Sequence, residues 1–331
     1  MTRYLTLTLA AGIAVLVLIA GCTTTQPSGP ATISPDVPAT PEKIITAVHT
    51  SAPSGKTAVP TPGQTAAKPL KPTPTTLPRI TVPEGSIAQY YTYTLNGKTD
   101  IIPLALPTGV YQDYTKKAAP SDKNGNSAYF LGYVNDPEQQ PYVAALARAI
   151  QEKTPVQDDQ ARIAISLVQH IPYRDGTQYR FPYEVLYSGQ GVCGEKSMLL
   201  ALLLEKLGYG SAVFYFVKED HMTAGIAVPT AYGYRGTGYA FIEATEPNII
   251  TYDGSVFSFG TLSSIPEVTV VGTGRPLATI ASDYEDARTY TTIAGNIKHL
   301  SATESAQLDS LDAKYDLSYY TCQKCKVPPV A

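Results

Sequence analysis

A glycine-containing turn that leads into a long apolar run, residues 189–208, constrains the fold of this chain more than any other segment. The turn reads Gly-Gln-Gly-Val-Cys-Gly, and a run dominated by leucine follows it after three further residues. Apolar residues fall on every side of a helix built from this run, so we expect that helix to be buried on most of its faces. Cys193 begins the predicted helix, and Gly208 ends it.

Cys193 is therefore expected at a helix N-terminus, which changes the chemistry of its thiol. The unpaired N–H groups of the first turn and the positive end of the helix dipole favour the thiolate, which is the nucleophilic form of cysteine. The backbone N–H of Cys193 is also placed to stabilise an oxyanion. Gln190 and Tyr187, which precede it, are the side-chain candidates for a second oxyanion donor.

Three short strand-like runs follow the helix and predict an antiparallel meander: residues 211–217, 221–228 and 238–244. A loop centred near Tyr232 and Gly233 would place His221 directly opposite Glu243. Opposed side chains have Cβ atoms roughly 4.5–5.5 Å apart, close enough for a carboxylate to hold an imidazole. We therefore expect Glu243 to orient His221, and the other ring nitrogen of His221 to face Cys193.

Each of these residues also has a structural interpretation. A cysteine at a helix start is often a small buried hydrophobe, and His221 and Glu243 are compatible with ordinary turn and strand positions. The order of the three residues and their places at element ends favour a joint catalytic role. Substitutes for the acid and the base are also present: Asp220, Glu246 and Asp253 for the acid, and His170 for the base.

Residues 142–253 resemble the transglutaminase-like superfamily. The resemblance rests on four stretches: Val-Gln-His-Ile-Pro-Tyr at 168–173, Gly-Val-Cys at 191–193 with its helix, His221, and Phe-Ile-Glu-Ala-Thr at 241–245. It implies an α+β fold with a papain-like core, in which a central cysteine helix packs on an antiparallel sheet. The family often has aspartate where this chain has Glu195 and Glu243.

The resemblance also implies roles for the three site residues. Cys193 is the nucleophile, His221 the general base and acid, and Glu243 the orienting carboxylate. Such a site transfers an acyl group from a peptide or side-chain amide through a thioester. Water as the acceptor gives a peptidase or amidase, and a lysine amine gives a cross-linking acyltransferase. The alternative is a catalytically silent transglutaminase-like module that binds peptides or glycans.

The chain begins with the layout of a secretory leader: Arg3, an apolar run over residues 5–20, and then Gly21 and Cys22. The tetrapeptide that ends at Cys22 resembles the lipobox of prokaryotic lipoproteins, so residues 1–21 are predicted to be a signal peptide and Cys22 to receive lipid. Lipid would anchor the protein to the cell membrane on its extracytoplasmic face, where a peptide or protein would be the substrate. An uncleaved anchor helix is the alternative, but the run is shorter than the roughly 20 residues that span a bilayer comfortably.

Composition divides the rest of the chain into four segments: residues 22–83, 84–140, 141–275 and 276–331. The first is rich in Pro, Thr, Ser and Ala, which cannot bury enough apolar surface to offset chain entropy, and is predicted to be a disordered stalk. The second is predicted to be β-rich, because Asn96 and Gly97 separate two strand-like runs and indicate a hairpin. The third is the transglutaminase-like core, and the fourth is predicted to be helical with a terminal CxxC.

Helices are predicted on both sides of the cysteine helix. Residues 141–153 carry apolar side chains at helical spacing. Thr154 and Gln157 form a predicted capping box for the next helix, which ends before Pro172. Residues 283–314 are predicted to be mostly helical.

The cysteines and the net charge bear on metal-binding, redox and nucleic-acid-binding functions. With lipid on Cys22, the natural local disulfide is Cys322 with Cys325, which leaves Cys193 free. Two idle thiols, a zinc half-site and a redox-active pair are the alternatives for this CxxC, but no second Cys or His cluster completes a zinc site. The net charge of -3 offers no basic surface for nucleic acid. The sequence contains no recognisable metal or cofactor motif, so neither is expected.

Overall fold

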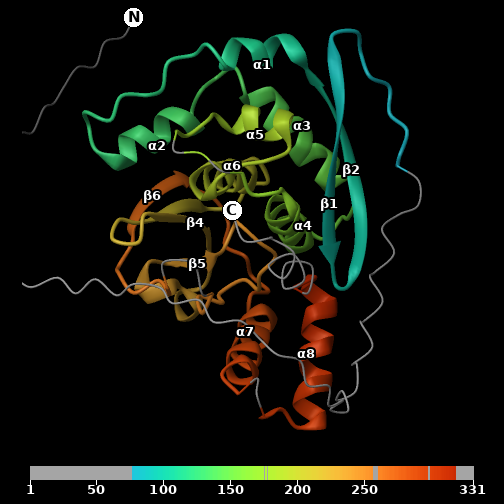
Figure 1. Ribbon diagram of the computed structural model, residues 1–331, viewed down its shortest axis with the longest axis vertical. Helices are drawn as coiled ribbons and strands as arrows, with labels where there is room; N and C mark the ends of the chain where they lie inside the picture. The colour runs from blue at the N-terminus through green and yellow to red at the C-terminus, as the bar shows by residue number, and fades with distance from the viewer. Residues whose placement is uncertain (1–76, 175, 177, 256–259, 297–298, 318–331) are drawn as a thin grey trace, which may run out of the picture. The chain divides into compact units, whose positions relative to one another are not determined.

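Helix α6 (Cys193–Lys206) lies between a layer of helices and a four-stranded sheet (Figure 1). The computed structural model describes residues 77–174, 176, 178–255, 260–296 and 299–317. All of them belong to one of the two units of the chain, residues 68–331, and the other unit, residues 1–67, lies outside the described residues. The predictions for the signal peptide, for Cys22 and for the pair Cys322 and Cys325 also fall outside them.

The described residues form eight α-helices and two antiparallel sheets, which confirms the predicted α+β class. Strands β1 (Ser86–Leu95) and β2 (Lys98–Pro107) form a two-stranded hairpin. Its turn consists of Asn96 and Gly97, whose φ angles are 49° and 78°. Both values are positive, as the Asn-Gly turn predicts.

Along the chain, five helices follow this hairpin and precede α6. They are α1 (Thr108–Tyr114), α2 (Asn126–Val134), α3 (Gln140–Gln151), α4 (Gln157–His170) and α5 (Pro182–Ser188). Helix α3 matches its prediction closely. Helices α1 and α2 lie in the segment predicted to be β-rich, and each is shorter than three turns, which is too short for a clear apolar period.

The start of α4 differs from the prediction. Val156 is the N-cap in place of Thr154, and no side chain caps it. The Thr154 hydroxyl accepts a 3.1 Å hydrogen bond from the Val156 N–H, and the Thr154 carbonyl accepts one from Gln160. Thr154 therefore closes a local turn ahead of the helix, which is a competing use of threonine near helix starts.

The four-stranded sheet has the order β5-β4-β3-β6, and every neighbouring pair is antiparallel. The predicted meander is present as β3 (Ser211–Phe216), β4 (His221–Ala227) and β5 (Tyr239–Ile242). Strand β6 (Glu267–Gly272) was not predicted and adds to the sheet beside β3. Two 3₁₀ turns, Thr230–Tyr232 and Tyr234–Gly236, form the connection between β4 and β5.

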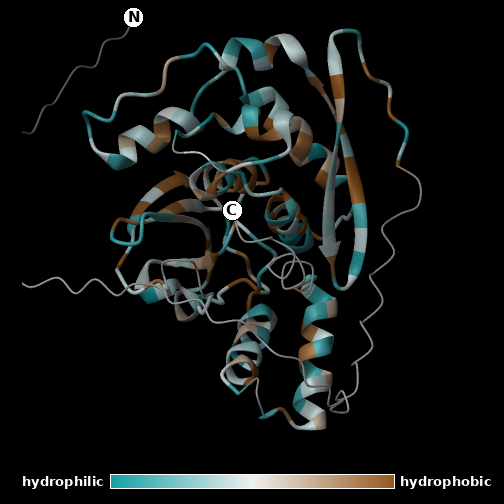
Figure 2. Ribbon diagram, viewed as in Figure 1, coloured by the Kyte–Doolittle hydropathy of each residue, from teal (hydrophilic) through white to brown (hydrophobic). Residues whose placement is uncertain are grey.

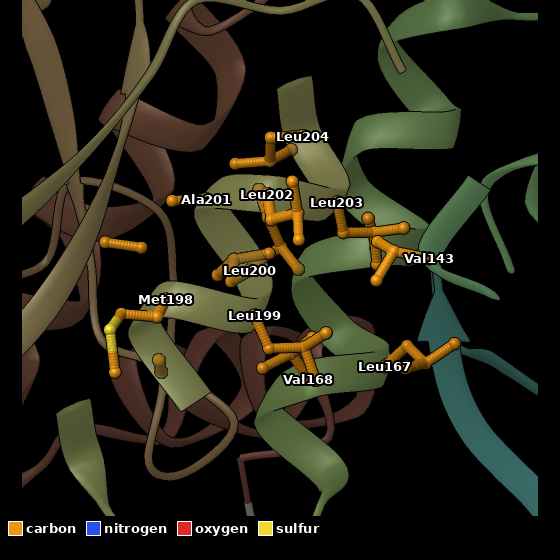
Figure 3. Packing of buried hydrophobic residues seen from close by; sticks show 14 of the residues in the cluster. Val143, Leu167, Val168, Met198, Leu199, Leu200, Ala201, Leu202, Leu203 and Leu204 are labelled. Carbon is orange, nitrogen blue, oxygen red and sulfur yellow. The ribbon is translucent and has the colours of Figure 1, made fainter. Parts of the chain in front are cut away.

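The apolar run of α6 is fully enclosed, as expected. Its residues from Met198 to Leu204 are at most 2% exposed, and Figure 2 shows the helix as a brown, hydrophobic element. Leu199 lies toward Val168 of α4, and Leu203 lies toward Val143 of α3 (Figure 3). Each buried leucine contributes about 1.5–3 kcal/mol. Packing on both sides therefore holds the first residue of α6 in a fixed place.

Helices α7 (Ala281–Ala294) and α8 (Ala302–Tyr315) agree with the helical prediction for the C-terminal segment. Arg162 of α4 pairs with Asp283 of α7 at 2.7 Å, and the Lys314 carbonyl accepts a hydrogen bond from the Gly97 N–H. These contacts attach the segment to the core. None of the helices in the described part of the chain has the length and apolar character that a membrane span requires.

Candidate active site

Cys193 is the first residue of α6, and its side chain is partly exposed. The N-cap is Val192, whose side chain cannot accept a hydrogen bond from the helix. The N–H groups of Cys193 and Gly194 belong to the first turn, where a helix supplies no acceptor of its own. The thiol forms no disulfide within the part of the chain that the structure describes. The predicted position is therefore confirmed, and the sulfur is not sealed in the core.

His221, the first residue of β4, and Glu243, just after β5, lie in contact. Nε2 of His221 is 3.0 Å from Oε2 of Glu243, and both side chains are buried. Since Nε2 faces the carboxylate, Nδ1 is the nitrogen left for the sulfur. His221 also shares a side-chain hydrogen bond with Cys193. The fold thus brings the three predicted residues together in the order Cys193, His221, Glu243.

The charges of the three residues reinforce one another. Burial lowers the pKa of His221, because it disfavours the imidazolium. The hydrogen bonds and negative charges of Cys193 and Glu243 outweigh burial and raise this pKa to about 10. Burial also raises the pKa of Glu243, but His221 and Thr245 bring it below its ordinary value. The geometry favours an imidazolium between two acidic groups near neutral pH.

Glu243 is held in place by its own neighbours. Oε1 accepts a 2.8 Å hydrogen bond from the Thr245 N–H and another from the Thr245 hydroxyl. The Glu243 carbonyl accepts a 2.8 Å hydrogen bond from Gln169 Nε2, which also donates to the Asn248 carbonyl. Both carboxylate oxygens therefore have partners, which fixes the direction in which Glu243 presents its charge to His221.

The prediction that His221 lies directly opposite Glu243 in the sheet is wrong. The pairing of β4 with β5 ends at Ala224 and Ile242, before either residue is reached. Glu243 follows the last residue of β5 and meets the ring of His221 beyond the paired part of the two strands. The paired residues are centred on Gly233, one residue later than direct opposition requires, and the two 3₁₀ turns lie in this loop.

Glu195, two residues after Cys193, is a fully buried carboxylate. It accepts hydrogen bonds from the backbone N–H groups of Val192 and Arg180 at 3.1 and 2.8 Å. It also pairs with the guanidinium groups of Arg174 and Arg180. These interactions attach the chain that carries both arginines to the start of α6. This role was not predicted from the sequence, although a charge at the start of so apolar a helix was a signal for it.

Tyr179 packs on the first turn of α6. A Cβ atom on Gly194 would lie 2.5 Å from Tyr179 Cε1 and 2.7 Å from Met222 Sδ. Glycine is therefore required for the ring to approach this close to Cys193. Tyr179 continues into an aromatic cluster, with Phe130 at 6.2 Å between ring centroids. Tyr179 was not predicted from the sequence, and the glycine that follows the cysteine was the available signal.

The two side-chain candidates for an oxyanion donor differ in their surroundings. The Tyr187 hydroxyl donates to Thr108 Oγ1 at 3.0 Å, and its ring stacks on Tyr111. This arrangement directs the only hydroxyl proton of Tyr187 to α1 and leaves none for an oxyanion. Gln190 has an exposed side chain in the turn ahead of Cys193, so it keeps the predicted position.

The substitute acids and base lie elsewhere or have other partners. Asp220 accepts a 3.3 Å hydrogen bond from Tyr215, and Asp253 is exposed. Glu246 lies after β5 and faces Lys196. His170 contacts the Ser166 carbonyl through Nδ1 and Asp316 through Nε2, at the junction of α4 and α8. A structural role explains these contacts of His170.

No group of three or more His, Cys, Asp or Glu side chains forms a candidate metal site within the residues that the structure describes. A cavity of about 270 Å³ lies between β1, α4, α7 and α8. Its charged lining is already paired, Arg162 with Asp283 and Lys314 with Asp286. Cys193 does not line this cavity.

No match to this chain was found among protein-family models, curated proteins or solved structures. The functional assignment therefore depends on the geometry of Cys193, His221 and Glu243.

Proposed function

We propose that this protein is a cysteine acyl-transfer enzyme that acts on peptide or side-chain amides. The observation that carries the proposal is the line of contacts from the partly exposed Cys193 through His221 to the buried Glu243. A nucleophile, a base and a group that orients the base are the three parts that covalent catalysis of this kind needs. Each comes from a different element, so the arrangement depends on the whole core.

The first half of the reaction forms a thioester. The Cys193 thiolate attacks the amide carbonyl carbon, and the backbone N–H of Cys193 donates to the developing oxyanion. The imidazolium of His221 gives its proton to the leaving amine as the C–N bond breaks. The acyl group is then bonded to sulfur, and His221 is neutral. Glu243 keeps the ring oriented and stabilises its charged form.

The second half returns the enzyme to its starting state. Neutral His221 takes a proton from the acceptor, and the acceptor attacks the thioester carbonyl. The C–S bond breaks, and sulfur leaves as the thiolate beside the imidazolium. Water as the acceptor releases a carboxylic acid, whereas a lysine amine creates a new amide bond.

The transglutaminase-like resemblance supports the same proposal. In that interpretation the α6 helix and the sheet of β3, β4 and β5 form a papain-like core, with Cys193 at the helix start and His221 and Glu243 at strand ends. Glutamate replaces the usual aspartate. The extra methylene suits a carboxylate that reaches the ring from beyond the end of β5.

The N-terminal sequence indicates where the protein acts in the cell. We infer that lipid on Cys22 anchors the protein on the extracytoplasmic face of the cell membrane, with a peptide or protein as substrate. Replacing Cys22 with Ser should move the protein from the membrane fraction to the soluble fraction. Equal membrane retention of Cys22→Ser would contradict the lipid anchor.

The experiment for the proposed activity uses casein as the acyl donor and a fluorescent primary amine as the acceptor. Incorporated fluorescence reports transamidation, and new carboxyl termini, or ammonia released in excess of the incorporated amine, report hydrolysis. We expect Cys193→Ser to abolish both products and His221→Gln to lower the rate about 10²–10⁴-fold. Cys322→Ser is the matched control and should keep the full rate. Undiminished turnover by Cys193→Ser would contradict the proposal, and binding of casein without turnover would favour the silent module.

A further inference from the structure

Lys196 is a fully buried lysine one helical turn after Cys193. Burying a cation costs several kcal/mol unless hydrogen bonds compensate for the lost water. Its neighbours along α6 are apolar from Met198 onward, and a leucine or methionine would continue that pattern. A lysine at this position therefore needs a reason beyond packing.

The ammonium of Lys196 has three carbonyl acceptors. Nζ donates to the carbonyls of Gln169 and Ile171 at 3.2 and 2.6 Å, and to the Thr245 carbonyl at 2.9 Å. An ammonium has three N–H donors, so all of them are used. A neutral amine has only two and would leave one buried carbonyl without its donor. The three acceptors therefore favour the charged form.

These acceptors connect Lys196 to the site. Thr245 is the residue whose N–H and hydroxyl hold the Glu243 carboxylate, and Gln169 is the residue whose amide holds the Glu243 carbonyl. The stem of Lys196 also packs under the turn before Cys193, since a Cβ on Gly191 would lie 3.1 Å from Lys196 Cγ. One side chain thus contacts the supports of Glu243 and the turn that precedes the nucleophile.

The ionisable groups facing Lys196 are acidic. They are Cys193 on the same helix, and Glu243 and Glu246 at and beyond the end of β5, whereas α4 contributes carbonyls. Burial lowers the pKa of Lys196 to about 7, against the opposing effect of these acidic groups. A positive charge here favours the thiolate over the thiol, because residues three apart share one side of a helix.

We propose that Lys196 is a positioning residue of this site, whose ammonium fixes the supports of Glu243 and favours the thiolate of Cys193. This inference rests on the proposed function, and it makes Lys196 a residue that regulates the nucleophile Cys193. Loss of the Lys196 proton would remove both effects, so the site is coupled to the charge of a buried lysine.

The test measures the rate at which iodoacetamide alkylates Cys193 as a function of pH, which needs no substrate. We expect Lys196→Met to move the midpoint of this profile up by about one pH unit, or about tenfold in rate on its acidic side. Lys196→Arg keeps the charge and should recover part of the shift. Lys206→Met, at the end of the same helix where Lys206 pairs with Glu205, is the matched control and should leave the profile unchanged.

A second measurement uses the unmodified sequence and so does not depend on whether Lys196→Met folds. Coupling between two groups is reciprocal, so carbamidomethylation of Cys193 must lower the midpoint at which the Lys196 ¹⁵Nζ signal titrates. An unchanged ¹⁵Nζ midpoint, or a folded Lys196→Met protein with the normal profile, would overturn this inference alone. A Cys193 that resists alkylation in the unsubstituted protein would overturn the proposed function as well.

Discussion

Nε2 of His221 lies 3.0 Å from Oε2 of Glu243, although the pairing of β4 with β5 ends at Ala224 and Ile242. His221 lies before the part of β4 that pairs with β5, and Glu243 follows the last residue of β5. The two residues are therefore not direct strand partners. The extra methylene of glutamate helps its carboxylate to reach the ring, which gives a physical reason for glutamate in place of aspartate.

Glu243→Gln is expected to weaken the site without changing its shape. The amide removes the negative charge that stabilises the His221 imidazolium, so the pKa of His221 falls and less thiolate is present. We expect Cys193 alkylation near pH 6 to slow about tenfold, which corresponds to about 1.4 kcal/mol. Glu243→Asp should have a similar effect because the shorter side chain withdraws from the ring. Asp253→Asn, at an exposed position, should match the unsubstituted protein, and equal slowing in it would refute this role for Glu243.

The charge of His221 should persist well above neutral pH. Its pKa in the folded protein is raised to about 10, against an ordinary value of 6.5. A raised histidine pKa stabilises the fold fully below about pH 6.5, and that contribution is lost as the pH rises toward 10. We expect NMR to detect the imidazolium at pH 8. A neutral ring at that pH would rule out the ion pair.

Much of the fold was predictable because the signals were local. The leucine-rich run of α6 and the Asn-Gly turn each specify their conformation within a few residues. Cys193 was predictable for the same reason, since its position at the helix start follows from its own segment. The short strands β3, β4 and β5 were recognisable by alternation and turn residues.

What the sequence could not specify depends on contacts between distant segments. The β4–β5 register depends on two 3₁₀ turns in the loop, and a loop centre displaced by one residue moves the strand partner by two. The structural role of Glu195 depends on its ion pairs with Arg174 and Arg180, and the segment that carries them returns to the helix start only in the folded state. Lys196 is identifiable as buried only once α6 is enclosed on all sides.

Glu195→Gln is expected to destabilise the fold. The substitution leaves two guanidinium groups beside a neutral amide in a buried position, and breaking a buried ion pair in this way costs about 3–5 kcal/mol. Equilibrium denaturation with urea measures the loss. Glu285→Gln removes an exposed pair with Arg288 and should cost less than about 1 kcal/mol. Equal effects of the two substitutions would show that Glu195 does not hold the arginines in place.

Gly194→Ala tests the approach of Tyr179 to the nucleophile. The added methyl would lie 2.5 Å from the ring, so the ring must move, at a cost of about 1–3 kcal/mol. Gly109→Ala in α1 is the matched control, because a Cβ there meets no atom within 4 Å. We expect only the Gly194 variant to lose stability and to alter Cys193 reactivity. Thermal unfolding and alkylation rates together distinguish the two variants.

The most direct measurement is the rate of Cys193 alkylation by iodoacetamide between about pH 5 and pH 9, with the labelled residue mapped by mass spectrometry. A thiolate held beside the His221 imidazolium should react at pH 6 almost as fast as at pH 9. An ordinary thiol would instead slow about tenfold for each pH unit below about 8.5. That ordinary profile, or a Cys193 that is not labelled at all, would contradict the account.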